Sequence, residues 1–303
     1  MKTKNFFYTI IVILYIPITI HGAIANYNHF PTLTPLHILD EKLTNISFAF
    51  SMRVLESDYN GPLIRLRRAS DNSEKDFGWG DNDIVDVAAI NAWRSGSNVY
   101  VHTWYDQSGL GRDAVQTISS KQPRFYADVA YPYFQGNGVD DYLTIDTPNG
   151  IQDVTHAGKE GTIISILKAT NKSQYTFGVA NGTNRWSAHT NWNNGDIYFD
   201  PGICCNNPRS FLNNTNTNKW AQYTFIRTNA NIIMRTNALE KVNGAYTLGA
   251  CTRTEDFAIG WATGASSSEK STTGFIEFIM YKIDIDAIKY KKIENNSIIF
   301  WGL

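Results

Sequence analysis

Hydrophobic residues alternate with polar ones along most of this 303-residue chain, in short runs bounded by turn-forming residues. Alternation with a period of two is typical of strands that are buried on one face. Turn signals such as Asp71-Asn72, Ser108-Gly109 and Asn137-Gly138 separate the runs. The pattern predicts strands over residues 46–54, 63–68, 99–104, 132–135, 142–145, 161–168, 220–227, 232–236, 257–260 and 274–281.

Three segments depart from this alternation and favour helices. Residues 83–93 place apolar side chains at helical spacing, with Asp81 or Asp83 as the N-cap. Residues 286–299 form a closing amphipathic pattern, and a shorter helix is expected around residues 36–43. Few helices among many short strands indicate an all-β fold.

The strand order of the second half, with its final helix, is similar to the concanavalin-like and laminin-G-like group of domains. We therefore expect a jelly-roll β-sandwich with a short N-terminal helical elaboration. Residues 26–303 are expected to form a single domain, with a laminin-G-like half over 151–303 and the other half over 26–150. Asn243-Gly244 is the predicted turn of a hairpin.

Residues 1–25 have the pattern of a secretory signal peptide. Lys2 and Lys4 precede an apolar stretch from Phe6 to Ile20, and Ala23-Ile24-Ala25 offers small residues for cleavage. An uncleaved membrane anchor is the alternative, although the stretch is short for a spanning helix. Since no later segment is long and apolar enough to cross a bilayer, we expect a secreted protein with no membrane attachment after cleavage.

Secretion agrees with the glycosylation sequons and the cysteines. Three cysteines occur, and a disulfide is expected to join Cys251 to Cys204 or Cys205, or to join Cys204 to Cys205. N-glycosylation is expected at the Asn-X-Ser/Thr sequons of Asn45, Asn171, Asn181, Asn213 and Asn295.

Composition narrows the possible partners. The formal net charge of −1 gives no electrostatic reason to expect nucleic acid as a partner. Aromatic residues make up 13% of the chain, which fits a strand-rich core and also fits sugar binding, because aromatic rings stack on the apolar faces of sugars. No Cys/His spacing indicates zinc, no calcium-loop pattern is present, and no nucleophile-elbow motif occurs. We expect no cofactor and no metal.

Two segments carry a specific resemblance. Gly61-Pro-Leu-Ile-Arg-Leu-Arg-Arg-Ala-Ser-Asp71 alternates apolar and basic residues before a turn, and Thr103-Trp-Tyr-Asp-Gln-Ser-Gly-Leu-Gly-Arg-Asp113 follows a predicted strand. Together they resemble the catalytic domain of the α-L-arabinofuranosidase B family of secreted glycoside hydrolases. The resemblance is specific over roughly residues 48–123. It implies a ligand with terminal α-L-arabinofuranosyl groups, as in plant-type polysaccharides.

The resemblance also implies a retaining mechanism with two carboxyl groups roughly 5 Å apart. The family places a nucleophilic Glu in an Asp-Leu-Glu-Asn-Gly segment and an acid/base Asp after an Ile-Gly-Gly strand end. The corresponding segments here offer Asp196 and Asp200 in the first, and no carboxylate before Glu269 in the second. Asp200 with Glu269 is the best catalytic pair, and ordinary turn or rim carboxylates are the alternative. Asp106 in Tyr-Asp-Gln-Ser-Gly is interpreted as a turn residue, and Glu277 as solvent-facing, Arg-paired or cleft-facing.

The family also has adjacent cysteines beside its sugar pocket, whose place is taken here by Gln174-Tyr175. A sugar-binding surface is predicted from Trp186, Trp192, Tyr198 and Trp261, with edge packing as the alternative.

Two functions follow from these observations, and a purely structural secreted protein is the third possibility. One is a glycoside hydrolase of the α-L-arabinofuranosidase type, and the other is an inactive, lectin-like or adhesive glycan-binding sandwich. Two carboxylates within about 6 Å across a cleft favour the first, whereas a cleft lined by aromatic and amide side chains favours the second.

Overall fold

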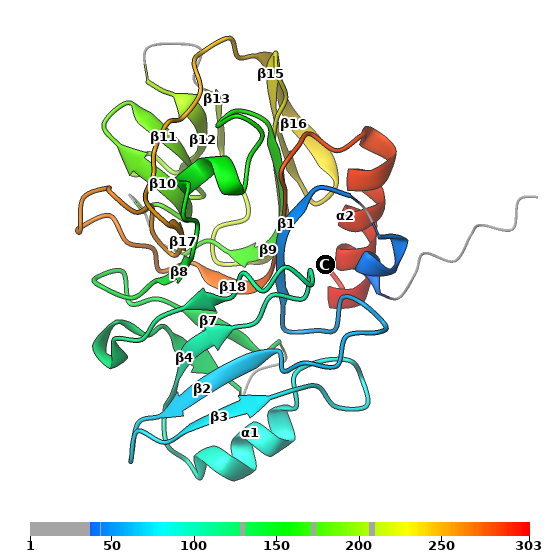
Figure 1. Cartoon of the computed structure of the whole chain (residues 1–303), viewed down its shortest axis with the longest axis vertical. Coiled ribbons are helices and arrows are strands. Elements are labelled where there is room, and N and C mark those ends of the chain that lie inside the picture. The colour runs from blue at the N-terminus through cyan, green and yellow to red at the C-terminus, as the bar shows by residue number, and fades with distance from the viewer. Residues whose placement is uncertain (1–36, 43, 128–130, 171–173, 206–209) are drawn as a thin grey trace, which may run out of the picture. The chain divides into compact units, whose positions relative to one another are not determined.

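Strand β18 (Gly274–Tyr281) is the central strand of the fold, and all eight of its residues are buried. It pairs antiparallel with β1 (Ile46–Ser51), β7 (Tyr133–Gln135) and β9 (Gly161–Lys168) (Figure 1). The computed structural model describes residues 37–303, except 43, 128–130, 171–173 and 206–209. The predicted signal peptide and the sequon at Asn171 lie outside the described residues.

Two antiparallel layers account for the C-terminal half. The first runs β1–β18–β9–β14–β15–β16, with β14 Trp220–Arg227, β15 Asn231–Thr236 and β16 Leu239–Ala245. The second runs β13–β12–β11–β10–β17–β8, with β13 Ser210–Asn213, β12 Asp196–Ile203, β11 Asn184–His189, β10 Phe177–Asn181, β17 Phe257–Ile259 and β8 Leu143–Ile145.

The N-terminal half continues from the second layer. Strand β8 pairs with β5 (Ala114–Val115), and β5 pairs with β4 (Val99–Trp104). From β4 the sheet branches to β2 (Ile64–Arg68) and β3 (Glu74–Phe77) on one side, and to β6 (Arg124–Tyr126) and β7 on the other. The all-β prediction is confirmed, while the jelly-roll topology stays a prediction.

Aromatic side chains fill the space between the two layers of the sandwich. Phe177 packs edge-on against Phe225 at 5.5 Å between ring centroids, and Phe199 lies 5.3 Å from the same ring. Phe257, on the paired strand β17, and Phe278, on β18 of the other layer, also pack on Phe177. All five rings are at most 1% exposed, so the alternation along each strand is explained by one face buried in this core.

Helix α2 (Ala287–Trp301) covers the outer face of the first layer and packs on β9 and β14 (Figure 1). Asp286 caps it by accepting from the backbone N–H groups of Ile288 and Lys289, and Gly302 ends it with a φ of 66°. The expected helix is therefore confirmed, because its N-cap and its terminating glycine are both legible in the sequence.

The N-terminal helices differ from expectation in extent. Helix α1 (Val87–Arg94) lies beside β2 and β3 in Figure 1, and its N-cap is Asp86, whose side chain accepts from Ala89. The sequence offered Asp81 and Asp83, but these lie in the turn before the helix. The helix expected around residues 36–43 is a single 3-10 turn, Ile38–Glu41. Two further 3-10 turns occupy Ser119–Lys121 and Gly150–Asp153.

One turn prediction is wrong. Asn243-Gly244 lies inside strand β16, and the hairpin instead turns at Asn237-Ala238, where both residues have positive φ values of 48° and 59°. That conformation suits the tight twist between β15 and β16.

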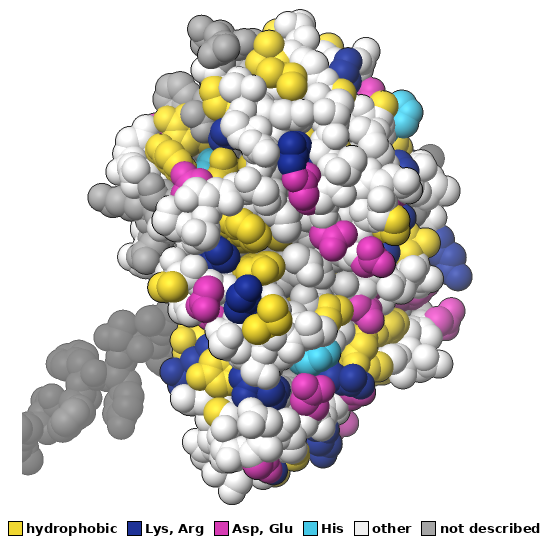
Figure 2. All heavy atoms as spheres, turned by 60° about the vertical axis from the view of Figure 1, so that its left-hand side comes forward, with side chains coloured by type: hydrophobic (Ala, Val, Ile, Leu, Met, Phe, Trp, Pro, Cys, Tyr) yellow, Lys and Arg dark blue, Asp and Glu magenta, His cyan; other side chains and the backbone are white. Residues whose placement is uncertain are grey.

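The described surface is mixed in charge. Figure 2 shows acidic and basic side chains interspersed on one face, as expected for a formal net charge of −1. Among the described residues, no helix combines the length and hydropathy needed to cross a bilayer.

Candidate functional site

Strands β10, β11 and β12 present a polar face on the side opposite the aromatic core. On β11, Trp186 and Ala188 point into the core, so Arg185, Ser187 and His189 occupy the other face. This face meets the loops that follow β9, β12 and β17 to form a pocket of about 500 Å³. The pocket is lined by Tyr175, Ala180, Asn181, Gly182, Arg185, Trp192, Cys205, Gly264, Ala265, Ser266 and Glu269.

Three aromatic rings in tilted and edge-on contact form one wall of the pocket. The His189 ring lies 4.0 Å from Tyr175 and 4.4 Å from Trp192, measured between ring centroids. The His189 Nδ1 lies 3.0 Å from the carbonyl oxygen of Gln174, which fixes the orientation of the imidazole. Because His189 is fully buried between them, Tyr175 and Trp192 are held rigidly while both still line the pocket.

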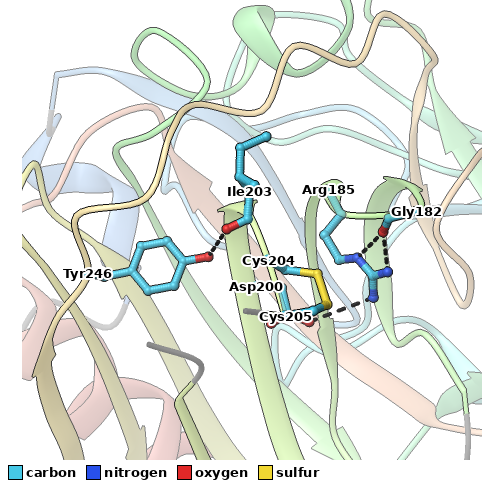
Figure 3. The surroundings of a disulfide bond; sticks show 7 residues. All are labelled: Gly182, Arg185, Asp200, Ile203, Cys204, Cys205 and Tyr246. Atoms are coloured by element: carbon cyan, nitrogen blue, oxygen red, sulfur yellow. Dashed lines mark hydrogen bonds and ion pairs between the residues drawn. A yellow bond between two sulfur atoms is a disulfide. The ribbon is translucent and has the colours of Figure 1, made fainter. Parts of the chain in front are cut away.

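A disulfide between Cys204 and Cys205 borders the pocket at the end of β12 (Figure 3). Of the pairings that the sequence allowed, the structure has the adjacent one, and Cys251 is a buried free thiol. Cys204 donates from its backbone N–H to Thr183 at 2.7 Å, and Tyr246 donates to the carbonyl of Ile203 at 2.9 Å. These bonds attach both sides of the disulfide loop to neighbouring segments.

Asp200 lies on β12 behind this wall and is fully buried. Its Oδ2 is 3.8 Å from Nη1 of Arg185, which itself lines the pocket (Figure 3). Arg185 is held by donating from Nε to Gly182 at 2.8 Å, and its guanidinium lies 5.7 Å from the Tyr175 ring centroid. The structure therefore places Asp200 beneath the pocket, with Arg185 and Cys205 on the pocket surface beside it.

Glu269 lies on the pocket wall, on the loop after β17. Its carbonyl oxygen accepts from the backbone N–H of Tyr175 at 3.0 Å, so its main chain is fixed next to the aromatic wall. Glu269 is the only carboxylate among the described residues that line the pocket.

The aromatic residues expected to form a sugar-binding surface separate into three groups. Trp186 has no exposed surface and packs on Phe199 at 5.2 Å, so its assignment to such a surface is wrong. Trp192 lines the pocket. Tyr198 lies 6.4 Å from Trp192 but is not among the lining residues, and Trp261 packs on Tyr142 at 5.1 Å, also outside the pocket lining.

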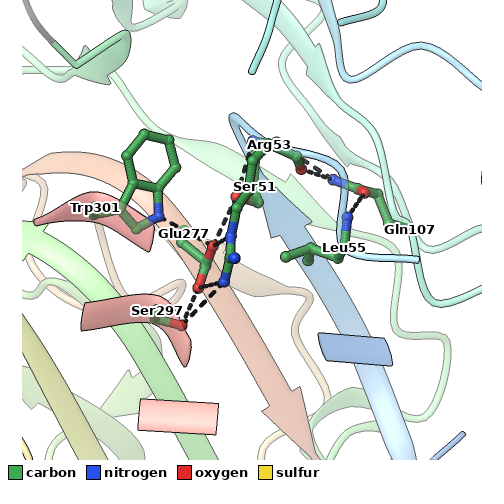
Figure 4. Close-up of polar contacts among 7 residues, drawn as sticks. All are labelled: Ser51, Arg53, Leu55, Gln107, Glu277, Ser297 and Trp301. Carbon is green, nitrogen blue, oxygen red and sulfur yellow. Dashed lines mark hydrogen bonds and ion pairs between the residues drawn. The ribbon is translucent and has the colours of Figure 1, made fainter. Parts of the chain in front are cut away.

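The Tyr-Asp-Gln-Ser-Gly segment has a structural role. Asp106 accepts hydrogen bonds from the backbone of Ala49, Ser108 and Arg112, as expected for a turn residue. Gln107 accepts from Leu55 and donates to the carbonyl of Arg53, which joins the loop to the chain after β1 (Figure 4).

Other carboxylates weighed in the sequence lie elsewhere. Glu277 is buried in β18 and pairs with Arg53, so it does not face the pocket (Figure 4). Asp196 begins β12 and accepts from the side chain of Asn194. The four described sequon asparagines, at positions 45, 181, 213 and 295, are exposed, and Asn181 is itself a pocket residue.

Among the described residues, one cluster of side chains could offer ligands to a metal, but it does not support a metal site. Asp200, Cys204 and Cys205 offer atoms within 4.8 Å of one another. However, both sulfurs are in the disulfide, and a metal ligand must be a thiolate. The cluster therefore provides a single carboxylate donor.

Sequence reasoning missed Arg185, Asn181 and Ser266 as pocket residues. One signal in the sequence pointed to Tyr175 as a pocket residue, because the resemblance placed it where the family has its adjacent cysteines. In this chain, Tyr175 and Cys205, one of its own adjacent cysteines, line the same pocket.

Comparisons with known proteins bear on the fold of the chain. Residues 35–130 match the family described as alpha-L-arabinofuranosidase B, catalytic. No curated protein sequence matches the chain significantly. A solved arabinofuranosidase in complex with arabinofuranosyl-alpha-1,2-xylobiose aligns with a TM-score of 0.68 at 13% identity. A GH54 α-L-arabinofuranosidase soaked with a cyclic sulfate inhibitor aligns with a TM-score of 0.61, also at 13% identity.

Each of these two alignments covers 88% of this chain and 65% of the solved chain. At such low identity they show a shared fold. The sequence match ends at residue 130, whereas the pocket residues lie between 175 and 269. The chain is thus an arabinofuranosidase-like protein, which resembles the α-L-arabinofuranosidase B catalytic family in the sequence of residues 35–130 and in its fold.

Proposed function

We propose that this chain is a secreted glycan-binding protein on an arabinofuranosidase-like scaffold, and that it binds without hydrolysing. The proposed site is the pocket between Tyr175, Trp192 and the Cys204–Cys205 disulfide. The proposed ligand is a terminal α-L-arabinofuranosyl group of a plant-type polysaccharide, a class suggested by the resemblance. The jelly-roll topology of that family is likewise part of the proposal.

The proposal rests on the number of carboxylates that are accessible in the pocket. A retaining glycosidase needs two carboxyl groups facing the substrate, roughly 5 Å apart. Glu269 lines the pocket, but Asp200 is fully buried and lies near Arg185. The neighbouring segments 171–173 and 206–209 contain no Asp or Glu in their sequence. Without a second accessible carboxylate, the glycosidic bond lacks either its nucleophile or its proton donor.

The remaining pocket chemistry suits sugar binding. Trp192 is partly exposed and offers aromatic surface, which stacks on the apolar face of a sugar ring, whereas Tyr175 is 4% exposed and supports it through His189. Ser266 and Arg185 provide a hydroxyl group and N–H donors for ring hydroxyl groups. A mostly preformed cavity with a few polar groups is the usual form of a small-ligand site.

Hydrolysis by Asp200 and Glu269 is the second candidate. It is favoured by the position of Asp200 directly beneath the wall, where a movement of Arg185 would open a path to the pocket. In that case Asp200 would act as nucleophile and Glu269 as acid/base, as in a retaining mechanism.

Two measurements on the purified protein test the proposal. Calorimetric titration with an arabinofuranosyl-substituted xylo-oligosaccharide should give binding that Trp192→Ala weakens about tenfold or more. Trp93→Ala is the matched control and should bind like the parent protein, because Trp93 lies on helix α1 and is not part of the pocket lining. Equal losses in both variants, or no binding by the parent protein, would refute the proposed site.

The second measurement is turnover of a chromogenic α-L-arabinofuranoside. We expect none above background. Turnover that disappears in Asp200→Asn would establish the hydrolase instead.

A further inference from the structure

A second pocket, of about 530 Å³, lies on the N-terminal half of the chain. Its floor is a cross-strand row formed by β2, β4, β6 and β7. Arg67 is paired in register with Tyr100, Tyr100 with Arg124, and Arg124 with Gln135, and all four residues line the pocket. The row therefore alternates guanidinium, phenol, guanidinium and amide across one sheet face.

Arg67 is a buried cation without an acidic partner among the described residues. It is 8% exposed and donates to Gln122 Oε1 at 2.6 Å, Asn72 Oδ1 at 2.9 Å and the carbonyl of Ser119 at 3.0 Å. All three acceptors are neutral. The flanking arginines of the same strand differ, since Arg65 pairs with Asp76 and Arg68 pairs with Asp71. A fixed, uncompensated positive charge thus lies in the floor of the pocket.

Arg124 is the second cation of the row, and it is exposed. It donates from Nη2 to Asn98 at 2.9 Å and forms no ion pair with any described residue. Its guanidinium lies 4.9 Å from the Tyr126 ring centroid, and that ring stacks on Tyr133 at 4.7 Å. Since both faces of Tyr126 are covered, this pocket offers hydrogen bonds and charge rather than an open ring for stacking.

Asp141 lines the same pocket as these arginines and is 6% exposed. Burial raises the pKa of Asp141 to about 7, although its carboxylate accepts from the backbone N–H of Asn137 at 3.0 Å. Asp140 next to it acts in the same direction. Below pH 7 the carboxyl group is mainly neutral, so the two arginines are not offset by it.

We propose that this pocket binds a carboxylate-bearing sugar, a uronic acid residue of a glycan, with Arg124 as the forked donor to the carboxylate and Arg67 as the fixed positive charge. A guanidinium matches the planar geometry of a carboxylate and donates two parallel hydrogen bonds. The amide oxygen of Gln135 and the hydroxyl groups of Ser119 and Ser120 line the same pocket and suit the hydroxyl groups of a sugar ring. The proposed site shares no lining residue with the Tyr175–Trp192 pocket, so it does not depend on the function proposed there.

Titration with trigalacturonate at pH 6 tests this proposal. We expect binding that is lost for the same trisaccharide after its carboxyl groups are reduced to alcohols. Arg124→Gln should weaken binding about tenfold or more, the effect of one charge-assisted bidentate contact. Arg65→Gln is the matched control, because it removes the same charge from a solvent-exposed arginine outside the pocket. Its affinity for trigalacturonate should stay within about twofold of the parent protein.

Inorganic sulfate separates this proposal from a general anion site. If sulfate at equal concentration displaces trigalacturonate, or if the reduced trisaccharide binds as well, the uronic acid assignment is wrong. Equal losses in Arg124→Gln and Arg65→Gln would indicate a nonspecific charge effect and would also overturn it.

The pH dependence gives an independent readout. Binding should weaken as the pH rises through 7, because ionised Asp141 repels the carboxylate, while Asp141→Asn should keep its affinity at pH 8. The other charged or titratable groups near Asp141 are Asp140, Lys121, Lys270, Tyr126 and the two arginines. Identical pH profiles for the parent protein and Asp141→Asn would contradict the proposed arrangement.

Discussion

Arg53 and Glu277 form a two-point ion pair without access to solvent. The Nε of Arg53 lies 2.7 Å from Oε2 of Glu277, and its Nη2 lies 3.2 Å from Oε1. The Ser51 hydroxyl donates to the same carboxylate at 2.9 Å, and Trp301 Nε1 does so at 3.3 Å (Figure 4). Burial alone would raise the pKa of Glu277, but the charge of Arg53 and these hydrogen bonds outweigh it and lower the pKa.

Replacing one partner of this ion pair should lower the free energy of unfolding more than replacing both partners. Glu277→Gln should lower the free energy of unfolding by about 3 kcal/mol, because it leaves the Arg53 charge buried without a counterion. The double variant Arg53→Met with Glu277→Leu should lie closer to the parent protein, since it buries no charge. Urea unfolding measures both. A Glu277→Gln variant as stable as the parent protein would contradict this account.

The Cys204–Cys205 disulfide is predicted to affect ligand binding more than stability. A bond between adjacent residues closes almost no chain loop, so it restricts the unfolded chain little. Reduction or Cys205→Ser should therefore change the free energy of unfolding by only about 0.5 kcal/mol. Affinity at the Tyr175–Trp192 pocket should fall several-fold, because the wall loses its fixed shape. Thermal unfolding and ligand titration, each with and without reductant, check the two parts separately.

Trp186 and Trp192 were both expected to bind sugar, but they should differ strongly in their contribution to stability. Trp186→Ala should cost about 3–5 kcal/mol of stability, because it opens a cavity among Phe177, Phe199 and Phe257. Trp192→Ala should cost much less, since its ring is only partly buried. Chemical denaturation of the two variants gives the comparison, and equal losses would place both rings in the core.

The raised pKa of Asp141 predicts an unusual dependence of stability on pH. Its carboxyl group binds a proton near pH 7 in the folded chain and near its ordinary value of 3.8 in the unfolded chain. Between these values the folded state holds more protons, so the contribution of this group to stability grows as the pH falls from 7 toward 4. In Asp141→Asn this contribution is absent. Melting temperatures of both proteins at pH 5 and pH 8 measure the difference, and parallel shifts would argue against a raised pKa.

The strands of the core were predictable from sequence because one face of each is continuously apolar. The bounds of β4, β9, β14 and β18 agree with the predicted segments residue for residue. Helix α2 was predictable for a different reason, since Asp286 and Gly302 mark its ends.

The pocket strands were not predicted, and their composition explains why. Ser187 on β11 and Asp200 on β12 are fully buried polar residues, and Gly178 on β10 has a φ of 121° where a Cβ would lie 2.2 Å from the carbonyl oxygen of Trp186. Such residues interrupt the apolar alternation that identifies a strand. Without the register of β11, sequence reasoning had no means of assigning Trp186 to the core and Arg185 to the pocket.

The position of β18 between β1, β7 and β9 has a consequence for how the chain is made. Ser51 and Glu277, which face each other across β1 and β18, are separated by 226 residues. Residues 35–130, the part with a family match, therefore leave the ribosome before their central partner strand exists. Contacts of such sequence separation form slowly, and the N-terminal strands remain without that partner until residues 274–281 have been synthesised. Correct folding of the chain would thus depend on protecting these strands from aggregation during synthesis.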